Sequence, residues 1–399
     1  MITDRAAGER ALGYPAAAGV FAVGMAGTTL PTPLYGLYRE QLGFSELMVT
    51  VVFAVYALGV ITVLLLAGNL SDETGRRPVL MCALGLSAAS ALCFLFEGGL
   101  PLLLVGRVLS GFAAGLFSGA ATAAVLELAK PGQEAHAGFA ATAANMGGLG
   151  CGPLLSGLLA QYTPWPLALP FLVHLVLVAV AAAVTWFLPE TVARPHRPRT
   201  LRPQRLRVPP EVRGVFAPSA VAAFAGFALL GLFTAVAPAF VSQTLDEHNL
   251  AVTGSVVFTV FLASTAGQLL TGRIGVRRAL PVGCLVLVVG LSLVATSLAV
   301  TALPVLVAGA VCGGAGQGLA FRAGLTAVGD AAPPAHRGGT ISAFFLVAYL
   351  GISLPVVGVG ALTMELGLRG AGLTFSACVI VLAVAVGLYV LRRPLPDAD

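Results

Sequence analysis

The sequence is dominated by long apolar runs, each about twenty residues in length, separated by short segments that hold most of the charged residues. A helix that crosses a bilayer needs about 20 consecutive, predominantly apolar residues. Hydrophobic residues make up 58% of the chain and charged residues 10%, whereas a soluble globular chain has about 25% charged residues. The sequence therefore predicts an all-α, multi-pass membrane protein whose partner over most of its surface is the lipid bilayer.

Charged residues and Pro/Gly clusters divide these apolar runs into twelve candidate membrane-spanning helices. The predicted spans cover roughly residues 14–37, 46–70, 77–97, 101–129, 135–160, 166–188, 215–241, 252–273, 277–298, 302–329, 337–363 and 368–391. The segment between the sixth and seventh spans is rich in Arg and Pro and has no helical apolar stripe, so we expect an exposed linker there.

The positions of Lys and Arg predict the orientation of the spans. If both termini are cytoplasmic, the cytoplasmic loops hold most of the basic residues, and the opposite side keeps only Arg39 and Arg369. This asymmetry is the one that the positive-inside rule requires, so we expect both termini in the cytoplasm and the protein in the cell (inner or plasma) membrane. The basic residues are scattered over many short loops without aromatic neighbours, and despite a net charge of +5 we expect no nucleic-acid partner.

The two halves of the chain resemble each other. When Gly111 in the fourth span is aligned with Gly314 in the tenth, Glu127 also aligns with Asp330. Parallel repeats of six helices are a known construction of transporters. We therefore expect two pseudo-symmetric six-helix bundles, at residues 1–188 and 215–399, joined by a cytoplasmic linker at 189–214.

The loop between the second and third spans, GNLSDETGRRPVL, concentrates charges that are rare elsewhere. Gly75 permits a turn that bulkier residues cannot adopt, Gly68 permits a close approach between helices, and Asp72 can pair with Arg76. The loop resembles the signature of the major facilitator superfamily, Gly-x-x-x-Asp-Arg/Lys-x-Gly-Arg-Arg/Lys, with Glu73 in place of the first base. The matching residues are Gly68, Asp72, Gly75, Arg76 and Arg77.

The resemblance implies a transporter that works by alternating access, with this loop as a conformational latch. In the family, the latch joins the loop to the eleventh helix and holds the cytoplasmic ends shut in the outward-open state. For Arg77, a simple role as a topology anchor is an open alternative.

The fifth span contains GLGCGPLLSG, with small residues that permit close helix contact and a proline that removes a backbone hydrogen bond. It resembles the antiporter signature of the superfamily, Gly-x-x-x-Gly-Pro-x-x-Gly-Gly, at Gly148, Gly152, Pro153 and Gly157, with Ser156 replacing one Gly. Mere helix packing is the alternative. The resemblance implies an exporter similar to the twelve-helix drug/proton antiporters.

Polar residues within the spans suggest a transport path. We place Arg107, Arg322, Asn145, Gln317, Tyr35 and Tyr349 on that path, with Gln268, Phe227 and Phe233 as further candidates for its walls. A charge inside a span usually faces a cavity or a partner, although both arginines could instead reach the interface. If both face the cavity, it is positively charged and favours a small anionic or carbonyl-rich amphiphile. Glu127 is too distant along its helix to neutralise Arg107, whereas Asp330 lies two turns from Arg322.

The coupling ion is implied by the resemblance alone. The first and seventh spans contain no Asp or Glu, although many drug/proton antiporters carry a carboxylate in the first. Protons are thus the coupling ion that the family implies, without a carboxylate to carry them. His174 could titrate, but we expect it to be packed or lipid-facing.

Other functional classes have less support in the sequence. No histidine belongs to a metal-binding or triad-type cluster, and no Gly-Lys-Ser/Thr phosphate-binding motif is present, so we expect no metal, no cofactor and no enzyme activity. A metabolite importer or facilitator of the same superfamily is the main alternative to an exporter, and a membrane-embedded enzyme or scaffold is a remote one. We expect a monomer.

Overall fold

The computed structural model describes residues 13–96, 98–192 and 206–393, and every regular element in these ranges is a helix. Half of the predicted linker, at 193–205, lies outside the described residues. Nine helices in the described part are long and apolar enough to cross a membrane. They are α4 (Glu46–Leu66), α6 (Arg76–Leu95), α7 (Leu100–Glu127), α10 (Leu169–Phe187), the run Pro210–Thr244, α13 (Leu250–Ile274), α14 (Val276–Val300), α15 (Leu303–Ala331) and α16 (Arg337–Arg392).

The remaining predicted spans fall on interrupted helices. The first coincides with α2 (Tyr14–Thr29), η2 (Thr32–Leu34) and α3 (Tyr35–Leu42), and the fifth with α8 (Glu134–Thr142), the π-helical η3 (Ala143–Gly147) and α9 (Gly148–Tyr162). The eleventh and twelfth both lie in α16, which is broken at Gly367 by a non-helical conformation with φ of 66° and ψ of 170°. The interruptions follow the sequence, because proline removes a backbone donor and glycine adopts positive φ without strain.

The run Pro210–Thr244 is also segmented. It consists of η4 (Pro210–Val212), α11 (Arg213–Gly231), η5 (Leu232–Val236), α12 (Ala237–Ala239) and η6 (Phe240–Thr244), of which η5 and η6 are π-helical. Pro238 lies in this part of the chain, as Pro31 and Pro33 lie between α2 and α3. Both regions therefore deviate from a regular helix near prolines that cannot donate a backbone hydrogen bond.

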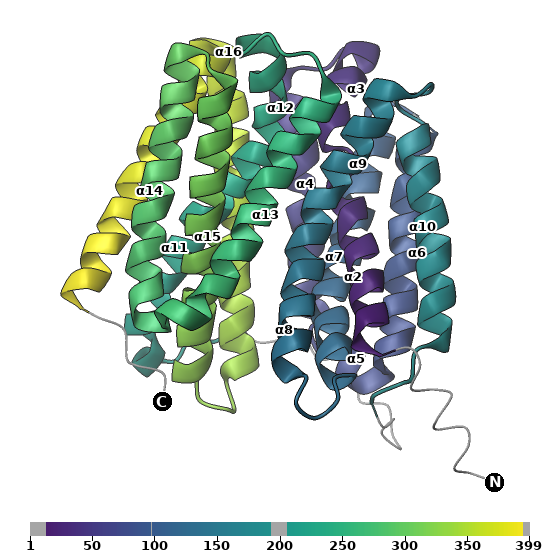
Figure 1. Cartoon of the computed structure of the whole chain (residues 1–399), viewed down its shortest axis with the longest axis vertical. Coiled ribbons are helices and arrows are strands. Elements are labelled where there is room, and N and C mark those ends of the chain that lie inside the picture. Colours follow the sequence, from purple (N-terminus) through teal and green to yellow (C-terminus); the bar gives the residue numbers. More distant parts are fainter. Residues whose placement is uncertain (1–12, 97, 193–205, 394–399) are drawn as a thin grey trace.

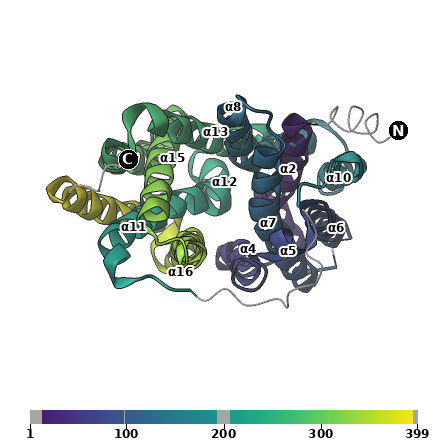
Figure 2. The same cartoon turned by 90° about the horizontal axis from the view of Figure 1, so that it is seen from below.

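The helices form two groups that lie side by side (Figures 1 and 2). The first group contains α2 to α10, with the short α5 (Leu70–Thr74), and the second contains α11 to α16. The turns before α6 and α14 are alike, since Gly75 (φ 104°, ψ 158°) and Gly275 (φ 82°, ψ 145°) share an extended conformation with positive φ. This likeness is what a repeated six-helix unit predicts.

We call the end of the molecule where α2 begins and α16 ends the terminal face, and the opposite end the far face (Figure 1). The two groups are packed together toward the far face, where glycines bring helices into close contact. A Cβ on Gly254 of α13 would overlap the Pro153 carbonyl oxygen of α9, and one on Gly360 of α16 would overlap the Thr50 hydroxyl of α4. The far face is therefore closed by two helix crossings between the groups.

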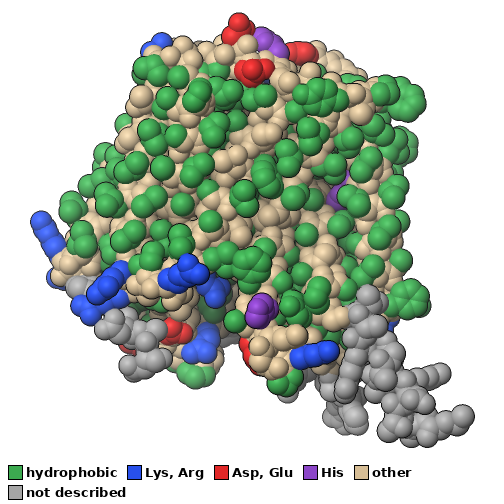
Figure 3. All heavy atoms as spheres, viewed as in Figure 1, with side chains coloured by type: hydrophobic (Ala, Val, Ile, Leu, Met, Phe, Trp, Pro, Cys, Tyr) green, Lys and Arg blue, Asp and Glu red, His purple; other side chains and the backbone are tan. Residues whose placement is uncertain are grey.

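The outer surface suits a hydrocarbon environment. Large apolar side chains such as Leu58, Val176 and Leu285 are more than half exposed, at 61%, 63% and 64%. Hydrophobic side chains cover the middle of the molecule, and most of the visible Lys and Arg side chains lie toward the terminal face (Figure 3). Such a surface belongs in a bilayer, because soluble monomers rarely expose contiguous apolar patches of this extent.

Candidate transport cavity

A central cavity of about 420 Å³ lies between the two helix groups and is lined by residues from both. Toward the terminal face it continues into a wider opening, with which it shares Leu126, Gly138, Thr142, Gln268 and Arg322. Its volume is within the range of about 300–1,000 Å³ that is usual for small-molecule sites. The cavity is thus open toward the terminal face and closed toward the far face.

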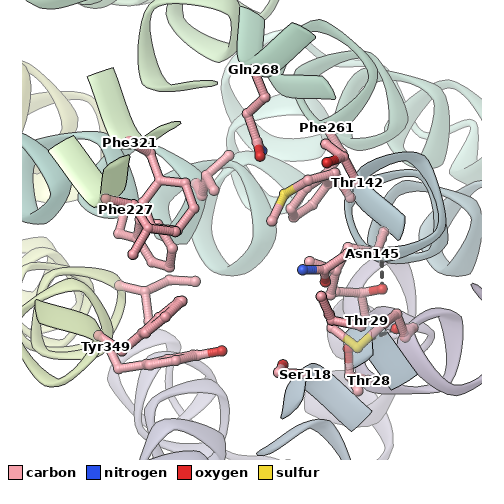
Figure 4. Close-up of a pocket in the computed structure, with 18 of the residues that line it drawn as sticks. Thr28, Thr29, Ser118, Thr142, Asn145, Phe227, Phe261, Gln268, Phe321 and Tyr349 are labelled. Carbon is pink, nitrogen blue, oxygen red and sulfur yellow. Dashed lines mark hydrogen bonds between the residues drawn. The ribbon is translucent and has the colours of Figure 1, made fainter. Parts of the chain in front are cut away.

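The two walls of the cavity differ in chemistry (Figure 4). The second helix group supplies an aromatic cluster, in which the ring centroid of Phe227 lies 5.1 Å from that of Phe321 and 6.0 Å from that of Tyr349. The first group supplies several hydroxyl and amide side chains, namely Thr28, Thr29, Ser118, Thr142 and Asn145, among apolar ones such as Met25 and Leu149. One apolar wall and one hydrogen-bonding wall can accommodate an amphipathic molecule.

Arg107 lies in the lining of this cavity and is only 1% exposed. Its Nη1 donates to the Thr28 carbonyl oxygen at 2.6 Å, and its guanidinium lies 4.8 Å from the ring centroid of Tyr56 and 5.5 Å from that of Phe53. Its Nε has no hydrogen-bond partner, and no carboxylate in the described part of the chain forms an ion pair with it. Carbonyls and aromatic rings thus hold a buried cation whose charge is not neutralised.

Arg322 is exposed and lines both the cavity and its opening. Among the described residues it forms no ion pair, so the contact with Asp330 that the sequence suggested is not made. No Asp or Glu is among the described residues that line the central cavity. Both arginines therefore contribute positive charge without a protein counter-ion.

The structure places only some of the predicted path residues at the cavity. Asn145 and Tyr349 line it, whereas Tyr35 lines a separate pocket on the far side together with Pro33 and Pro238. Gln317 is fully buried, and its Oε1 accepts a hydrogen bond of 2.6 Å from Ser264. Gln317 and Phe233, which is fully buried in the hydrophobic core, therefore do not line the cavity in this structure, and the place of Tyr35 on the transport path stays a prediction.

Other lining residues were missed, although the sequence held a signal for one set. Ser118 and Thr122 follow Arg107 by three and about four helical turns, so all three lie on the same face of α7. Thr142 similarly precedes Asn145 by one turn, and Phe321 is the neighbour of Arg322. An arginine that faces a cavity thus identifies the helix face on which other lining residues are found.

The fifth predicted span packs tightly against both helix groups. A Cβ on Gly148 would lie 2.7 Å from the Ala22 carbonyl oxygen of α2, and one on Gly152 would overlap the Ala26 carbonyl oxygen. On the other side, a Cβ on Gly157 would overlap the Leu250 carbonyl oxygen of α13. The glycines of this motif therefore hold α9 between α2 and α13.

Pro153 leaves the Leu149 carbonyl without its usual helical partner, because proline has no backbone N–H. The hydroxyl of Thr29 in α2 donates to this carbonyl oxygen at 2.7 Å. The π-helical η3 ends two residues before Leu149, and it contains the cavity-lining residue Asn145. The part of this span that borders the cavity thus contains a π-helical turn, which is frequent at functional sites, and is followed by a proline.

The loop before α6 forms an ionic network within the first helix group. Arg76 pairs with Asp72 at 2.5 Å and donates to both carboxylate oxygens of Glu127, at 2.7 and 3.2 Å. The carboxylate of Glu190 accepts the backbone N–H groups of Arg76 and Arg77 at 2.8 and 3.1 Å, which caps the N-terminus of α6. Gly75 has a φ of 104°, which L side chains rarely adopt, and a Cβ there would also lie 2.5 Å from Glu190 Oε2, so this position favours glycine.

Gly68 is exposed in the turn after α4, and its role in a close helix approach stays a prediction. The pairing of Asp72 differs from the expectation. In the described residues, Asp72 pairs within its own group, so the contact with the eleventh predicted span is not made while the cavity is open toward the terminal face. Arg77 donates to the Trp186 carbonyl oxygen at the end of α10.

His174 is packed in the first group and is 1% exposed. Its Nε2 lies 3.0 Å from the Ser87 hydroxyl, and a Cβ on Gly27 would overlap its ring. Of the two expected placements, packed or lipid-facing, the structure therefore has the packed one. No group of three metal-binding side chains is present in the described residues.

A two-group helical fold with a central cavity open at one end defines a class of membrane transporters. A family model described as "Major Facilitator Superfamily" matches residues 17–272 and 220–399, so the chain belongs to this superfamily of small-molecule transporters. It is therefore a multi-pass membrane transporter and not an enzyme.

Individual relatives agree with this assignment at different levels. The chain is 41% identical over 85 residues to "Multidrug resistance protein MdtL" from strains of Salmonella schwarzengrund and Salmonella newport, a match that covers 21% of this chain and 21% of each relative. A bacterial homologue of the human lysosomal transporter Spinster, in an inward-facing and unoccupied conformation, has a TM-score of 0.68 at 15% identity, with 98% of this chain and 99% of the other covered. The inward-facing and occupied form has a TM-score of 0.65, also at 15% identity, with 95% of each chain covered. These structural likenesses show the fold.

Proposed function

We propose that the protein is a secondary-active exporter of small amphipathic molecules that works by alternating access. The central cavity carries the proposal. It lies between two helix groups, opens at one face only, and contains a buried arginine that has no counter-ion among the described residues. Gly157 of α9 and Gly254 of α13 support alternating access, because they form a crossing between the groups that would separate when the far face opens. The partial likeness to multidrug resistance proteins supports export as the direction.

The proposed topology has twelve spans and places the terminal face in the cytoplasm, with the protein in the cell (inner or plasma) membrane. Arg76, Arg273, Arg278 and Arg337 all lie near this face, as the positive-inside rule requires. With this orientation the cavity is inward-open, as in the similar structures described as inward-facing. Residues 1–188 and 215–399 would then move as two units, joined by the linker at 189–214.

The proposed substrate is anionic or rich in carbonyl oxygens. Burying a charge without a partner is costly, so Arg107 favours a ligand that brings an acceptor. The hydroxyl wall can donate further hydrogen bonds, and the aromatic cluster can pack against an apolar part of the ligand. We propose protons as the coupling ion and a monomer as the functional unit, both from the family.

Transport in everted membrane vesicles tests this proposal. The vesicles should accumulate a fluorescent carboxylate-bearing amphiphile when a proton gradient, acidic inside, is imposed, and an uncoupler or a pore-forming peptide should abolish the accumulation. Vesicles without the protein provide the control. Accumulation that follows only the substrate gradient, and that survives Pro153→Ala, would instead support the importer or facilitator.

A further inference from the structure

A chain of polar side chains extends from the central cavity into the second helix group. Gln268 of α13 lines the cavity, whereas Ser264 of α13 and Gln317 of α15 are fully buried. The Ser264 hydroxyl donates to Gln317 Oε1 at 2.6 Å, and Gln268 Nε2 donates to Ser264 Oγ at 3.4 Å. We call these three residues the Gln–Ser–Gln chain.

Tight helix packing holds this chain in place. A Cβ on Gly318 of α15 would overlap the Ser264 carbonyl oxygen of α13, and one on Gly226 of α11 would lie 2.8 Å from the Cγ of Gln317. Ser264 and Gln268 are four residues apart, so their side chains are neighbours on one face of α13. Burying an amide and a hydroxyl is costly unless they are hydrogen-bonded, and here they bond to each other.

The two hydrogen bonds determine which end of the Gln268 amide remains for a ligand. A serine hydroxyl has a single proton, and Ser264 donates it to Gln317, so the Ser264 oxygen acts as the acceptor for Gln268. Gln268 therefore turns its Nε2 toward Ser264, and no described residue donates to its Oε1. The side chain reaches from α13 toward the open centre of the cavity (Figure 4).

The hydroxyl groups on the opposite wall also favour a ligand that donates. Three of them donate to backbone carbonyl oxygens, at 2.7, 2.8 and 3.1 Å, and they belong to Thr29, Ser118 and Thr142. A ligand acceptor has to displace one of these carbonyls to receive a proton, whereas a ligand donor leaves these bonds intact. Apart from Arg107 and Arg322, the cavity therefore offers acceptors most readily.

We propose that the transported amphiphile carries an N–H or O–H donor in addition to its anionic group, and that Gln268 selects for this donor by accepting its hydrogen bond. The inference rests on the proposed function and deepens it by naming the class of substrate. N-acylated amino acids are examples of this class, because they combine a carboxylate, an amide N–H and an apolar chain.

In this arrangement one ligand contacts both helix groups. Its anionic group lies with Arg107 of the first group, and its donor lies with Gln268 of the second. Ser264 and Gln317 do not line the cavity and act as positioning residues, because they hold the Gln268 amide with its oxygen toward the ligand.

Two compounds that differ in one N–H group test the inference. N-octanoylglycine has an amide N–H, and N-octanoylsarcosine carries a methyl group in its place. We expect octanoylglycine to compete at least about tenfold more strongly with the transport of a fluorescent carboxylate in everted vesicles, because a site built to hydrogen-bond a donor discriminates against an analogue that lacks it. Isothermal titration calorimetry with the purified full-length protein in detergent makes the same comparison without transport.

Variants of the chain separate hydrogen bonding from the bulk of the added methyl group. Gln268→Leu removes the acceptor and should reduce the preference to about twofold or less, whereas Gln268→Glu keeps an acceptor oxygen and should retain it. Ser264→Ala releases the Gln268 amide and should lower the preference to about threefold, with the maximal transport rate little changed. The matched control is Thr265→Val, which removes a neighbouring buried hydroxyl that lines neither the cavity nor its opening and should leave the preference unchanged.

The outcomes distinguish this inference from the proposed function. Equal competition by the two compounds, stronger competition by octanoylsarcosine, a preference that survives Gln268→Leu, or an equal loss in Thr265→Val would each overturn the inference while transport of the fluorescent carboxylate continues. If the fluorescent carboxylate is not transported at all, the proposed function fails. The calorimetric comparison then decides the inference by itself, since equal affinities for the two compounds would overturn it.

Discussion

Arg107 is held by a backbone carbonyl and two aromatic rings, and its charge has no carboxylate partner in the described residues. An uncompensated buried cation is costly to stability, so it is retained where function requires it. In this protein the residue lies where the polar wall of the first group meets Phe53 and Tyr56 at the cavity. A ligand that supplies an anion or a carbonyl would complete its coordination.

Replacing Arg107 should therefore affect transport far more than folding. We expect Arg107→Ala to lower the initial rate of transport in vesicles by at least about 100-fold, since a hydrogen bond to a charged group contributes roughly 1.5–3 kcal/mol and the cation–π contacts add to it. Arg107→Lys should restore only part of the rate, because lysine lacks the planar fork. Full transport by Arg107→Ala at normal expression would show that the arginine does not bind the substrate.

The hydrogen bond from Thr29 to Leu149 makes a second prediction at this scale. We expect Thr29→Val to lower the free energy of unfolding by about 1 kcal/mol, because the Leu149 carbonyl oxygen would lose its hydrogen-bond donor. In a Pro153→Ala background the new backbone N–H can bind this carbonyl, so Thr29→Val should then cost much less. Reversible unfolding in detergent micelles measures both values, and an equal cost in the two backgrounds would contradict this role of Thr29.

At the scale of helices, the sequence predicted where the described helices begin and end, but not the face that each helix turns toward the cavity. Apolar runs with charged ends define the limits of a span, so predicted and observed helices differ by only a few residues. The rotation of each helix about its own axis is harder to predict from the sequence. Gln317 and Arg322 are five residues apart, which places them about 140° apart around a helix, so the two could not both face one cavity.

Irregular turns added to this difficulty. Tyr35 follows the 3-10 turn η2, which changes the rotation of the residues after it, and Tyr35 lines the far-side pocket. The sequence also could not predict which residues the far-face glycines contact. It indicates close packing at Gly157, but it does not identify Leu250 as the partner.

In the loop before α6, Arg76 and Asp72 have different roles. Arg76 remains paired with Glu127 when Asp72 is neutralised, so Asp72→Asn should insert and fold normally. Asp72 itself is 60% exposed, and we propose that it is free to contact the second group when the terminal face closes. Asp72→Asn should then abolish transport and increase cysteine labelling of the cavity from the terminal face.

The matched control for this prediction is Glu73→Gln, which removes the same charge from the neighbouring position. It should transport at close to the normal rate. Unchanged transport in Asp72→Asn, or an equal loss in Glu73→Gln, would contradict the latch.

The crossing of α9 and α13 provides another prediction at the scale of helices. Because a side chain on Gly254 would overlap the Pro153 carbonyl oxygen, Gly254→Val should destabilise the closed far face by about 1–3 kcal/mol and favour its opening. Thr50, which is 3% exposed at the separate crossing of α4 and α16, can report this opening as Thr50→Cys in a variant without the native cysteines. A membrane-impermeant maleimide should label it faster from the far face.

Gly272→Val in the same helix is the control, because a Cβ at this position has no atom within 4 Å. It should leave the labelling of Thr50→Cys unchanged. If Gly254→Val also left the labelling rate unchanged, the far-face glycines would not control the opening.

At the scale of the whole molecule, two helix groups enclose a cavity with two arginines, an aromatic wall and no carboxylate among its described lining residues. The closed crossings at the far face and the opening at the terminal face give one of the two states that alternating access requires. We propose that the positive charge of the cavity determines which molecules the protein carries. The same charge makes a lipophilic cation an unfavourable substrate.

Competition in everted vesicles between compounds that share a skeleton but carry opposite charges tests this selectivity. The measurement is the concentration at which each competitor halves the transport of a fluorescent carboxylate, for pairs of amphiphiles that share one skeleton and differ in a carboxylate or a quaternary ammonium group. We predict that the carboxylates compete at least about tenfold more strongly, which corresponds to roughly 1.4 kcal/mol, and that Arg107→Ala removes the difference in any residual transport. If the quaternary ammonium compounds compete more strongly than their matched carboxylates, the cavity does not select anions.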